Sequence, residues 1–131
     1  MNYNTPQVGI AAMEVLEKAG YEVVVITDRC CGRPMISHGF LDEAKALSQE
    51  NMRVLAPYIK EGLPIVGCEP SCILTFRDEY PDLLRDQESR NLAGNSFLID
   101  EFLERLSYSS DFALRFTNKS RTVSYTHLRA H

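Results

Sequence analysis

The chain has 131 residues, of which 44% are hydrophobic, and a formal net charge of −4. Its length suits one domain or part of one, with an ordinary core. Its charges form no basic stripe of the kind that binds nucleic acid, and no apolar run approaches the ~20 residues of a membrane span. We therefore expect neither a nucleic-acid partner nor a transmembrane segment.

The first part of the chain predicts a helix followed by a buried strand. Thr5 and Pro6 suit the start of a helix, and Gly20 suits its end. One apolar stripe lies between them at helical spacing, formed by Val8, Ala11, Ala12, Val15, Leu16 and Ala19. The next segment, "YEVVVIT" from Tyr21 to Thr27, is short, β-branched and apolar on both faces, which is typical of a buried parallel strand. "DRCCGRP" then predicts a loop.

The remaining elements alternate between helix, strand and helix. A long helix is predicted from about Phe40 to Lys60, with one side formed by Leu47, Asn51, Val54, Leu55 and Tyr58. "LPIVG" is a second short apolar strand. Another helix is expected from near Ser71 until Pro81 disturbs it. "QESRNLAGN" predicts a polar loop, and "SFLIDEFLERL" resumes helical spacing through Phe97, Leu98, Phe102 and Leu106.

This order of elements predicts an α/β fold with a small parallel sheet flanked by helices. The adjacent Cys30 and Cys31 follow the first predicted strand, and Cys68 and Cys72 follow the second. Sites in such folds form at the carboxyl ends of the strands. If the two strands are neighbours, we expect the four sulfurs to converge at one edge of the sheet.

The C-terminal tail has a different character from the rest of the chain. "VSYTHLRAH", from Val123 to His131, shows no periodicity and resembles one translated reading frame of a common sequencing adapter. We interpret residues 122–131 as adapter read-through and residues 1–121 as the native part. The alternative is a genuine C-terminal strand.

The four cysteines admit several chemical roles. Without an evident signal peptide they indicate a reducing compartment, where cysteines serve as metal ligands or redox thiols. Thiolates select zinc or iron–sulfur clusters. Zinc motifs usually space their pairs as CxxC, which adjacent cysteines do not match. A thiol–disulfide redox protein would prefer CxxC at a helix start, and four buried inert cysteines would not be expected to pair in two loops.

The quoted cysteine segments carry a family resemblance. "GYEVVVITDRCCGRPMISHGFLDEAKAL" and "GLPIVGCEPSCILTFRDEYPDLL" resemble the cysteine-rich CCG domain. That domain occurs in heterodisulfide reductase and in the iron–sulfur subunits of glycolate oxidase and anaerobic glycerol-3-phosphate dehydrogenase. It also occurs in FAD-linked oxidases of the D-lactate dehydrogenase type, whose C-terminal region is the most similar. The resemblance covers nearly everything before the tail and implies an incomplete Rossmann-like domain that lacks its first strand and its second repeat.

The resemblance implies an iron–sulfur cluster, of the 4Fe-4S type, as the cofactor. Cys30, Cys31 and Cys72 match the ligand positions of the family. Cys68 departs from the pattern, because this chain has CxxxC where some members have CxxC. The implied function is electron transfer in an FAD-linked 2-hydroxy-acid dehydrogenase that acts on a lactate- or glycolate-type substrate. The isolated fragment is expected to be inactive.

The same resemblance implies partners and a location. FAD would bind another domain or subunit, since this chain has no dinucleotide-binding glycine fingerprint. A second CCG repeat and a quinone or other electron carrier are further expected partners. The expected location is the cytoplasm, either free or peripherally attached to the inner face of the membrane. The alternatives are a zinc-stabilised, non-catalytic interaction domain and a thiol-redox protein.

Residues beside the cysteines are candidates for supporting roles. Gly32 permits the tight turn that would aim both adjacent sulfurs at one centre. The Ser71 amide is a candidate hydrogen-bond donor to a sulfur, and such bonds tune the potential of a cluster. Arg29 and Arg33 would stabilise an anionic cluster, or else are solvated side chains. His38 would donate protons or contact a quinone, or else is a surface or capping residue.

Overall fold

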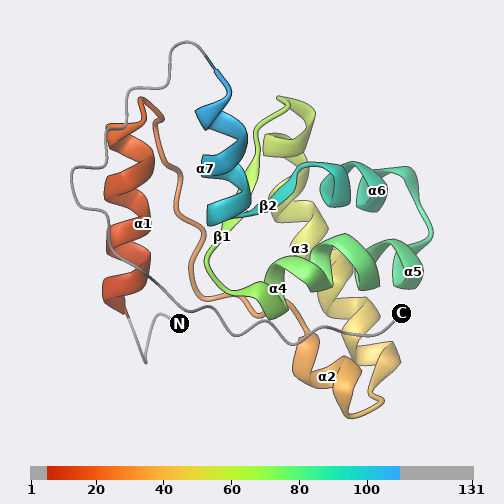
Figure 1. The fold of residues 1–131 in the computed structure, drawn as a ribbon. Helices are drawn as coiled ribbons and strands as arrows, with labels where there is room; N and C mark the ends of the chain where they lie inside the picture. The colour runs from red at the N-terminus through yellow and green to blue at the C-terminus, as the bar shows by residue number, and fades with distance from the viewer. Residues whose placement is uncertain (1–5, 110–131) are drawn as a thin grey trace.

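The computed structural model describes residues 6–109, so Thr5 and the tail from 122 to 131 lie outside the described residues. Figure 1 shows the order of the elements. They are α1 (Pro6–Lys18), α2 (Arg33–Ser37), α3 (Leu41–Lys60), β1 (Ile65–Gly67), α4 (Pro70–Leu74), the π-helical turn η1 (Thr75–Glu79), α5 (Tyr80–Leu84), α6 (Gln87–Gly94), β2 (Ser96–Leu98) and α7 (Ile99–Ser107). None of these helices has both the length and the apolar composition that crossing a bilayer requires.

The sheet consists of β1 and β2, which pair in parallel with Ile65 opposite Ser96 and Gly67 opposite Leu98. Helices α4 and α7 pack against these strands. The predicted α/β class with a small parallel sheet flanked by helices is therefore confirmed. The helices predicted at the positions of α1 and α3 are also confirmed. They could be predicted because their apolar periodicity is long and regular.

The segment Tyr21–Thr27 has no regular secondary structure, and within residues 6–109 it joins no sheet. Val24 and Val25 are 57% and 52% exposed, so the prediction of a buried strand there is wrong. β-branched residues favour an extended backbone, but their preference for sheets depends on packing against neighbours. In Figure 1 this segment runs from the end of α1 past β1 toward α2. It carries the chain to the cysteines without pairing.

The predictions for residues 87–98 are also wrong. The expected polar loop forms α6, and the first residues of the expected helix form β2. The Ser89 amide donates to Asp86 Oδ1 over 2.8 Å, which caps α6. Only one large apolar residue of α6 is fully buried, Leu92, so the helix lacks the repeated apolar stripe that would have revealed it.

The helix predicted to be disturbed at Pro81 instead continues to Leu84. Proline lacks the N–H that an α-helix needs at that position. Here Pro81 lies in the first turn of α5, and the wider turn of η1 directly precedes it. The segment ends at Arg85, whose φ of 55° is left-handed. The π turn thus accommodates the proline within a continuous helical segment.

The core lies between α3, α5 and α6. Its fully packed members are Met52, Leu55, Tyr80 and Leu92, and Ile59, Ile65, Phe76 and Leu84 pack around them. Within α3 the buried positions are Ala44, Ser48, Asn51, Met52 and Leu55. Asn51 and Leu55 of the predicted stripe are therefore buried, while its remaining members are half-buried.

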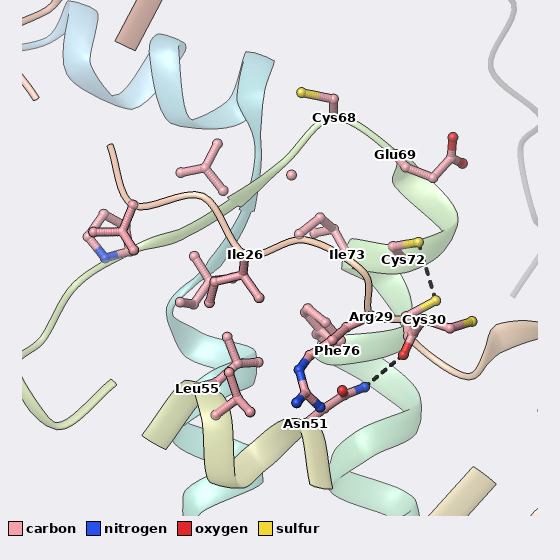
Figure 2. Close-up of a pocket in the computed structure, with 17 residues that line it drawn as sticks. Ile26, Arg29, Cys30, Asn51, Leu55, Cys68, Glu69, Cys72, Ile73 and Phe76 are labelled. Carbon is pink, nitrogen blue, oxygen red and sulfur yellow. Dashed lines mark hydrogen bonds between the residues drawn. The ribbon is translucent and has the colours of Figure 1, made fainter. Parts of the chain in front are cut away.

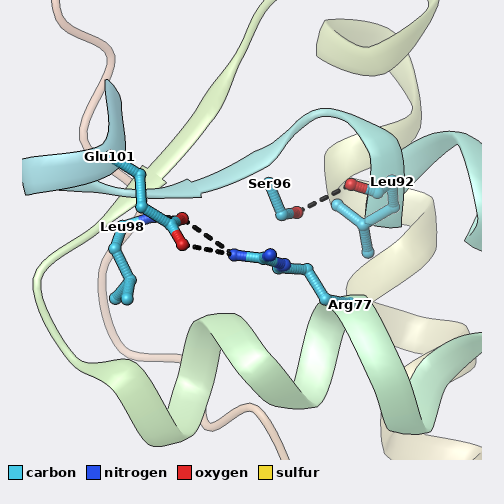
Figure 3. Close-up of polar contacts among 5 residues, drawn as sticks. All are labelled: Arg77, Leu92, Ser96, Leu98 and Glu101. Atoms are coloured by element: carbon cyan, nitrogen blue, oxygen red, sulfur yellow. Dashed lines mark hydrogen bonds and ion pairs between the residues drawn. The ribbon is translucent and has the colours of Figure 1, made fainter. Parts of the chain in front are cut away.

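Polar contacts join the C-terminal elements to this core, as Figure 3 shows. Arg77 of η1 donates to both carboxylate oxygens of Glu101 on α7, over 3.0 and 2.8 Å. Glu101 also accepts a hydrogen bond from the Leu98 amide over 3.0 Å, which satisfies the start of α7. The Ser96 hydroxyl donates to the Leu92 carbonyl over 2.7 Å. These bonds fix α7 and β2 relative to the helices that carry the cysteine site.

Candidate metal centre

One cavity of about 270 Å³ is lined by all four cysteines. Cys30 and Cys31 reach it from the loop that precedes α2. Cys68 reaches it from the turn after β1, and Cys72 reaches it from α4. Ile26, Leu55, Ile73 and Phe76 contribute apolar walls (Figure 2). The structure therefore brings the two cysteine-bearing corners together, as the order of elements predicts.

Two of the four sulfurs are in direct contact. Cys31 and Cys72 share a hydrogen bond of 3.3 Å between their Sγ atoms, although they lie in different corners of the chain. Cys31 is only 6% exposed. The hydrogen bond to Cys72 lowers the pKa of Cys31, and the same contact raises the pKa of Cys72. The contact therefore favours a single thiolate that accepts a hydrogen bond from the other thiol.

The neighbouring Cys30 lies in a different environment from Cys31. Cys30 is exposed, and its Sγ accepts a hydrogen bond from the Gly32 amide over 3.4 Å. Gly32 has a φ of 90°, in the left-handed region that glycine adopts without strain. Gly32 therefore permits a tight turn here, but the two adjacent thiols do not face one point. The turn places one thiol of the adjacent pair inside the protein and the other at its surface.

Cys68 lines the same cavity but does not join the contact pair. Its side chain points away from Cys72 in Figure 2. Burial raises the pKa of the Cys68 thiol. Among residues 6–109 no group of three or more His, Cys, Asp or Glu side chains is already arranged to hold a metal ion. The structure thus brings two sulfurs together and places the other two at the walls of the same cavity.

The donor set suits a thiolate-ligated centre in its chemistry. Four free thiols line one partly apolar cavity, and the pair formed by Cys31 and Cys72 shows that ligands from both corners can reach a common point. Soft sulfur ligands select zinc, copper(I) or iron–sulfur clusters over hard cations. Cys30, which is adjacent to Cys31, is exposed and lines the same cavity.

The two arginines beside the adjacent cysteines have carboxylate partners. Arg29 lines the cavity and pairs with Glu50 over 3.4 Å at the surface. Arg33 forms an ion pair with Glu79 of η1, and both side chains are half-buried. Arg33 therefore fastens α2 to η1, and only Arg29 is among the residues that line the cavity.

His38 and Ser71 make contacts other than the predicted ones. The Nδ1 atom of His38 lies 2.7 Å from the Pro34 carbonyl, and the imidazole is not among the groups that line the cavity. The Ser71 amide and hydroxyl both donate to the Glu69 carboxylate, over 3.3 and 3.0 Å. The prediction that the Ser71 amide donates to a sulfur is therefore wrong, because the Glu69 carboxylate caps the start of α4 and takes that donor.

Two site residues were not predicted from the sequence. Asn51 on α3 donates to the Cys30 carbonyl over 2.8 Å, and Tyr80 on α5 donates to the Cys31 carbonyl over 2.9 Å. Asn51 Nδ2 also donates to the Tyr80 hydroxyl over 2.8 Å. Burial raises the pKa of Tyr80 to about 12, so the hydroxyl keeps its proton and remains a donor. The only available signal was a polar Asn51 on an otherwise apolar stripe.

Comparisons with known proteins find similarity to a cysteine-rich family. The family model described as "CCG: Cysteine-rich domain" matches residues 1–77. One of the subunits of the anaerobic glycerol-3-phosphate dehydrogenase of Escherichia coli (strain K12) is 34% identical over 86 residues, which cover 64% of this chain and 22% of that protein. No solved structure matches the chain significantly.

Two other relatives are similar over different lengths. The lactate utilization protein A of Exiguobacterium sp. is 28% identical over 129 residues, covering 94% of this chain and 51% of the relative. The D-2-hydroxyglutarate dehydrogenase of Haemophilus influenzae is 30% identical over 71 residues, covering 54% of this chain and 7% of the relative. This chain therefore spans between 7% and 51% of the length of these three curated relatives.

Proposed function

Because the chain belongs to the CCG cysteine-rich domain family, we propose that it is part of an iron–sulfur electron-transfer module of an oxidoreductase. The observation that carries the proposal is the contact of 3.3 Å between Cys31 and Cys72, which joins the two cysteine-bearing corners within one cavity. An interaction domain that binds no metal would not need free thiols gathered at one cavity.

In this proposal Cys30, Cys31 and Cys72 are ligands of a 4Fe-4S-type cluster, and Cys68 is the candidate for a fourth position. Such a centre supplies one-electron transfer when it is bound. The chain's own residues provide thiolates, apolar walls and the side chain of Arg29, which also lines the cavity. Burial and nearby positive charge are among the factors by which a protein sets the potential of such a centre.

We further propose that the parent protein is an FAD-linked dehydrogenase of a 2-hydroxy acid such as lactate or glycolate. The names of the lactate utilization protein A and the D-2-hydroxyglutarate dehydrogenase support this substrate class. A flavin domain or subunit and a second CCG repeat would complete the module. Electrons would then pass from the flavin through the cysteine-ligated centre to a quinone or another carrier, at the inner face of the membrane or in the cytoplasm.

Anaerobic reconstitution with iron and sulfide tests the proposal, both on this chain and on the longer parent protein. We expect broad visible absorption together with iron and acid-labile sulfide. Stoichiometric zinc in a colourless protein would instead support a zinc-stabilised interaction domain. If the parent protein binds iron and this chain does not, the assignment is right and the chain lacks some of the cluster ligands. If neither binds iron, the assignment is wrong.

Cysteine substitutions in the protein that binds iron assign the ligands. Cys31→Ser is expected to abolish the visible absorption, because Cys31 is the buried member of the contact pair. Cys68→Ser is the matched comparison, since Cys68 lines the same cavity without contacting the pair. Circular dichroism shows whether both variants remain folded. Full iron content in Cys31→Ser would contradict the assignment.

A dithiol redox pair is the second candidate, and the contact between the free thiols of Cys31 and Cys72 favours it. Oxidation would form one disulfide and release two protons and two electrons to an acceptor disulfide. A glutathione redox titration monitored by mass spectrometry tests this candidate. A reversible disulfide at cellular potentials, without iron binding in the parent protein, would support it over the cluster.

A further inference from the structure

Two neighbouring carbonyl groups in the cysteine loop are held by side chains from the core. Asn51 of α3 donates to the Cys30 carbonyl over 2.8 Å, and Tyr80 of α5 donates to the Cys31 carbonyl over 2.9 Å. Asn51 is 3% exposed and Tyr80 is fully buried. We propose that Asn51 and Tyr80 are positioning residues that fix the backbone of Cys31 so that its thiol faces Cys72 before any metal binds.

Two hydrogen bonds can fix the backbone of Cys31 because of the geometry of the peptide unit. The Cys30 carbonyl belongs to the planar peptide unit before the Cα atom of Cys31, and the Cys31 carbonyl belongs to the unit after it. Fixing both planes fixes φ and ψ of Cys31. The direction of its Cα–Cβ bond is then determined, because that bond has a fixed orientation relative to the two planes.

The two donors are themselves held rigidly. Tyr80 is a member of the core cluster, and its ring lies 5.0 Å from the ring of Phe76 between centroids. Asn51 precedes the core residue Met52 on α3 and also donates to the Tyr80 hydroxyl over 2.8 Å. The cysteine loop is thus tied to two packed helices at adjacent points.

The orientation of the Asn51 amide agrees with this role. A carbonyl oxygen can accept hydrogen bonds only, so the amide nitrogen must face the Cys30 carbonyl. The other amide atom, Asn51 Oδ1, is buried and has no hydrogen-bond partner in the described part of the chain. Burying an unpaired acceptor is unfavourable. The Asn51 side chain therefore makes its hydrogen bonds through its NH2 group, and one of these bonds goes to the cysteine loop.

The two adjacent thiols lie in different environments, as a fixed backbone at Cys31 would require. Cys31 is buried against Cys72, whereas Cys30 is exposed and its sulfur accepts a bond from Gly32. Any use of this arrangement for a cluster rests on the proposed function. The tether itself does not, because it is made by the chain alone.

The test measures how readily the thiols of Cys31 and Cys72 form a disulfide with each other, expressed as an effective concentration relative to glutathione. It uses the full chain without metal. Cys30 and Cys68 are first replaced by serine, and disulfide formation between the remaining thiols is titrated with glutathione. We expect Tyr80→Phe to lower the effective concentration by about threefold to tenfold, the range expected from losing one hydrogen bond. Asn51→Ala is expected to lower it at least as much, because it removes two bonds.

Matched controls separate positioning from general destabilisation. Tyr58→Phe removes a hydroxyl from the half-buried tyrosine of α3, and Asn91→Ala removes an exposed amide from α6. Both controls should leave the effective concentration unchanged. In the chain that keeps Cys30, whose sulfur accepts the Gly32 amide hydrogen bond, exchange at that amide should be faster in Tyr80→Phe than in Tyr58→Phe. If Tyr80→Phe does not fold, Asn51→Ala carries the same comparison.

The outcomes distinguish this inference from the proposed function. Unchanged effective concentration and unchanged exchange in both Tyr80→Phe and Asn51→Ala would overturn the positioning role, whatever the protein binds. A lower effective concentration in both variants would establish that role. This holds even if the parent protein binds no iron, a result that would overturn the proposed function alone.

Discussion

At the scale of single residues, the cysteine site depends on how tightly the chain packs at the corners that carry the cysteines. The corner that holds Cys68 and Cys72 packs tightly where β1 meets α4. A Cβ atom added at Gly67 would lie 2.5 Å from the Cδ1 and Cγ1 atoms of Ile73. Ile73 is 2% exposed and cannot easily move away. Gly67 is therefore needed because no side chain fits there.

Gly67→Ala is accordingly expected to destabilise the protein by about 1–3 kcal/mol, the usual cost of overpacking. Urea denaturation measures the effect. The matched control is Gly94→Ala, since a Cβ atom there would meet nothing within 4 Å. Ile73→Ala is expected to relieve the clash, so the double variant should lose less stability than the sum of the two single variants. Additive losses would contradict the proposed contact.

The sequence reveals the cysteines but not the residues that hold them. Cysteines carry their chemistry in the side chain, so their pairing in two loops is visible in the sequence. Asn51 and Tyr80 act on backbone carbonyls of distant residues. Such hydrogen bonds depend on the packing of α3 against α5 and leave no local pattern. The prediction for Ser71 fails for a related reason, because its amide bonds to the nearby Glu69 carboxylate instead of a sulfur.

At the scale of elements, predictions succeed where apolar periodicity is long and fail where capping or pairing decides the structure. Helix α3 has 20 residues and a repeated buried stripe, so its period can be recognised. Helix α6 has 8 residues, and its start depends on the hydrogen bond between Asp86 and Ser89. The segment Tyr21–Thr27 has strand composition, but within residues 6–109 no neighbouring strand pairs with it.

The cap of α6 makes a prediction about pH. The backbone and side-chain hydrogen bonds from Ser89 hold the pKa of Asp86 below its usual value. A depressed pKa means that the stabilisation is present above the unfolded-state pKa and is lost as pH falls through the folded-state pKa. Asp86→Asn keeps a capping side chain that does not titrate, and Asp86→Ala removes the cap at a cost of about 1 kcal/mol.

Urea denaturation from neutral pH to about pH 2 measures these effects. We expect the stability of the wild type relative to Asp86→Asn to be constant near neutral pH and to fall under acidic conditions, below the ordinary aspartate value of 3.8. Asp82→Asn, which changes an exposed carboxylate in the first turn of α5, is the matched control. Parallel curves for the wild type and Asp86→Asn would show that Asp86 does not contribute through its charge.

At the scale of the whole molecule, two parts differ in how firmly they are packed. Helices α3, α5 and α6 enclose the core that supports the cysteine loop. Helix α1 buries only Leu16, and the segment after it reaches α7 through an edge contact of 5.5 Å between the rings of Tyr21 and Phe102. The segment Tyr21–Thr27 runs beside β1, even though it does not pair with it (Figure 1). For this reason the predicted convergence of the two corners holds although the predicted strand does not form.

This unequal packing predicts that α1 opens before the rest of the protein. Local opening requires less free energy where few apolar contacts are broken. Native-state hydrogen exchange should therefore show lower opening free energies for the amides of α1 than for those of α3. Leu16→Ala should lower the opening free energy of α1 further, with little effect on the free energy of global unfolding. Leu92→Ala, at a fully buried core position, should lower the free energy of global unfolding by about 2–5 kcal/mol. Equal opening free energies in the two helices would mean that α1 is an integral part of the core, and the cysteine loop would then depend on α1 as much as on α3 and α5.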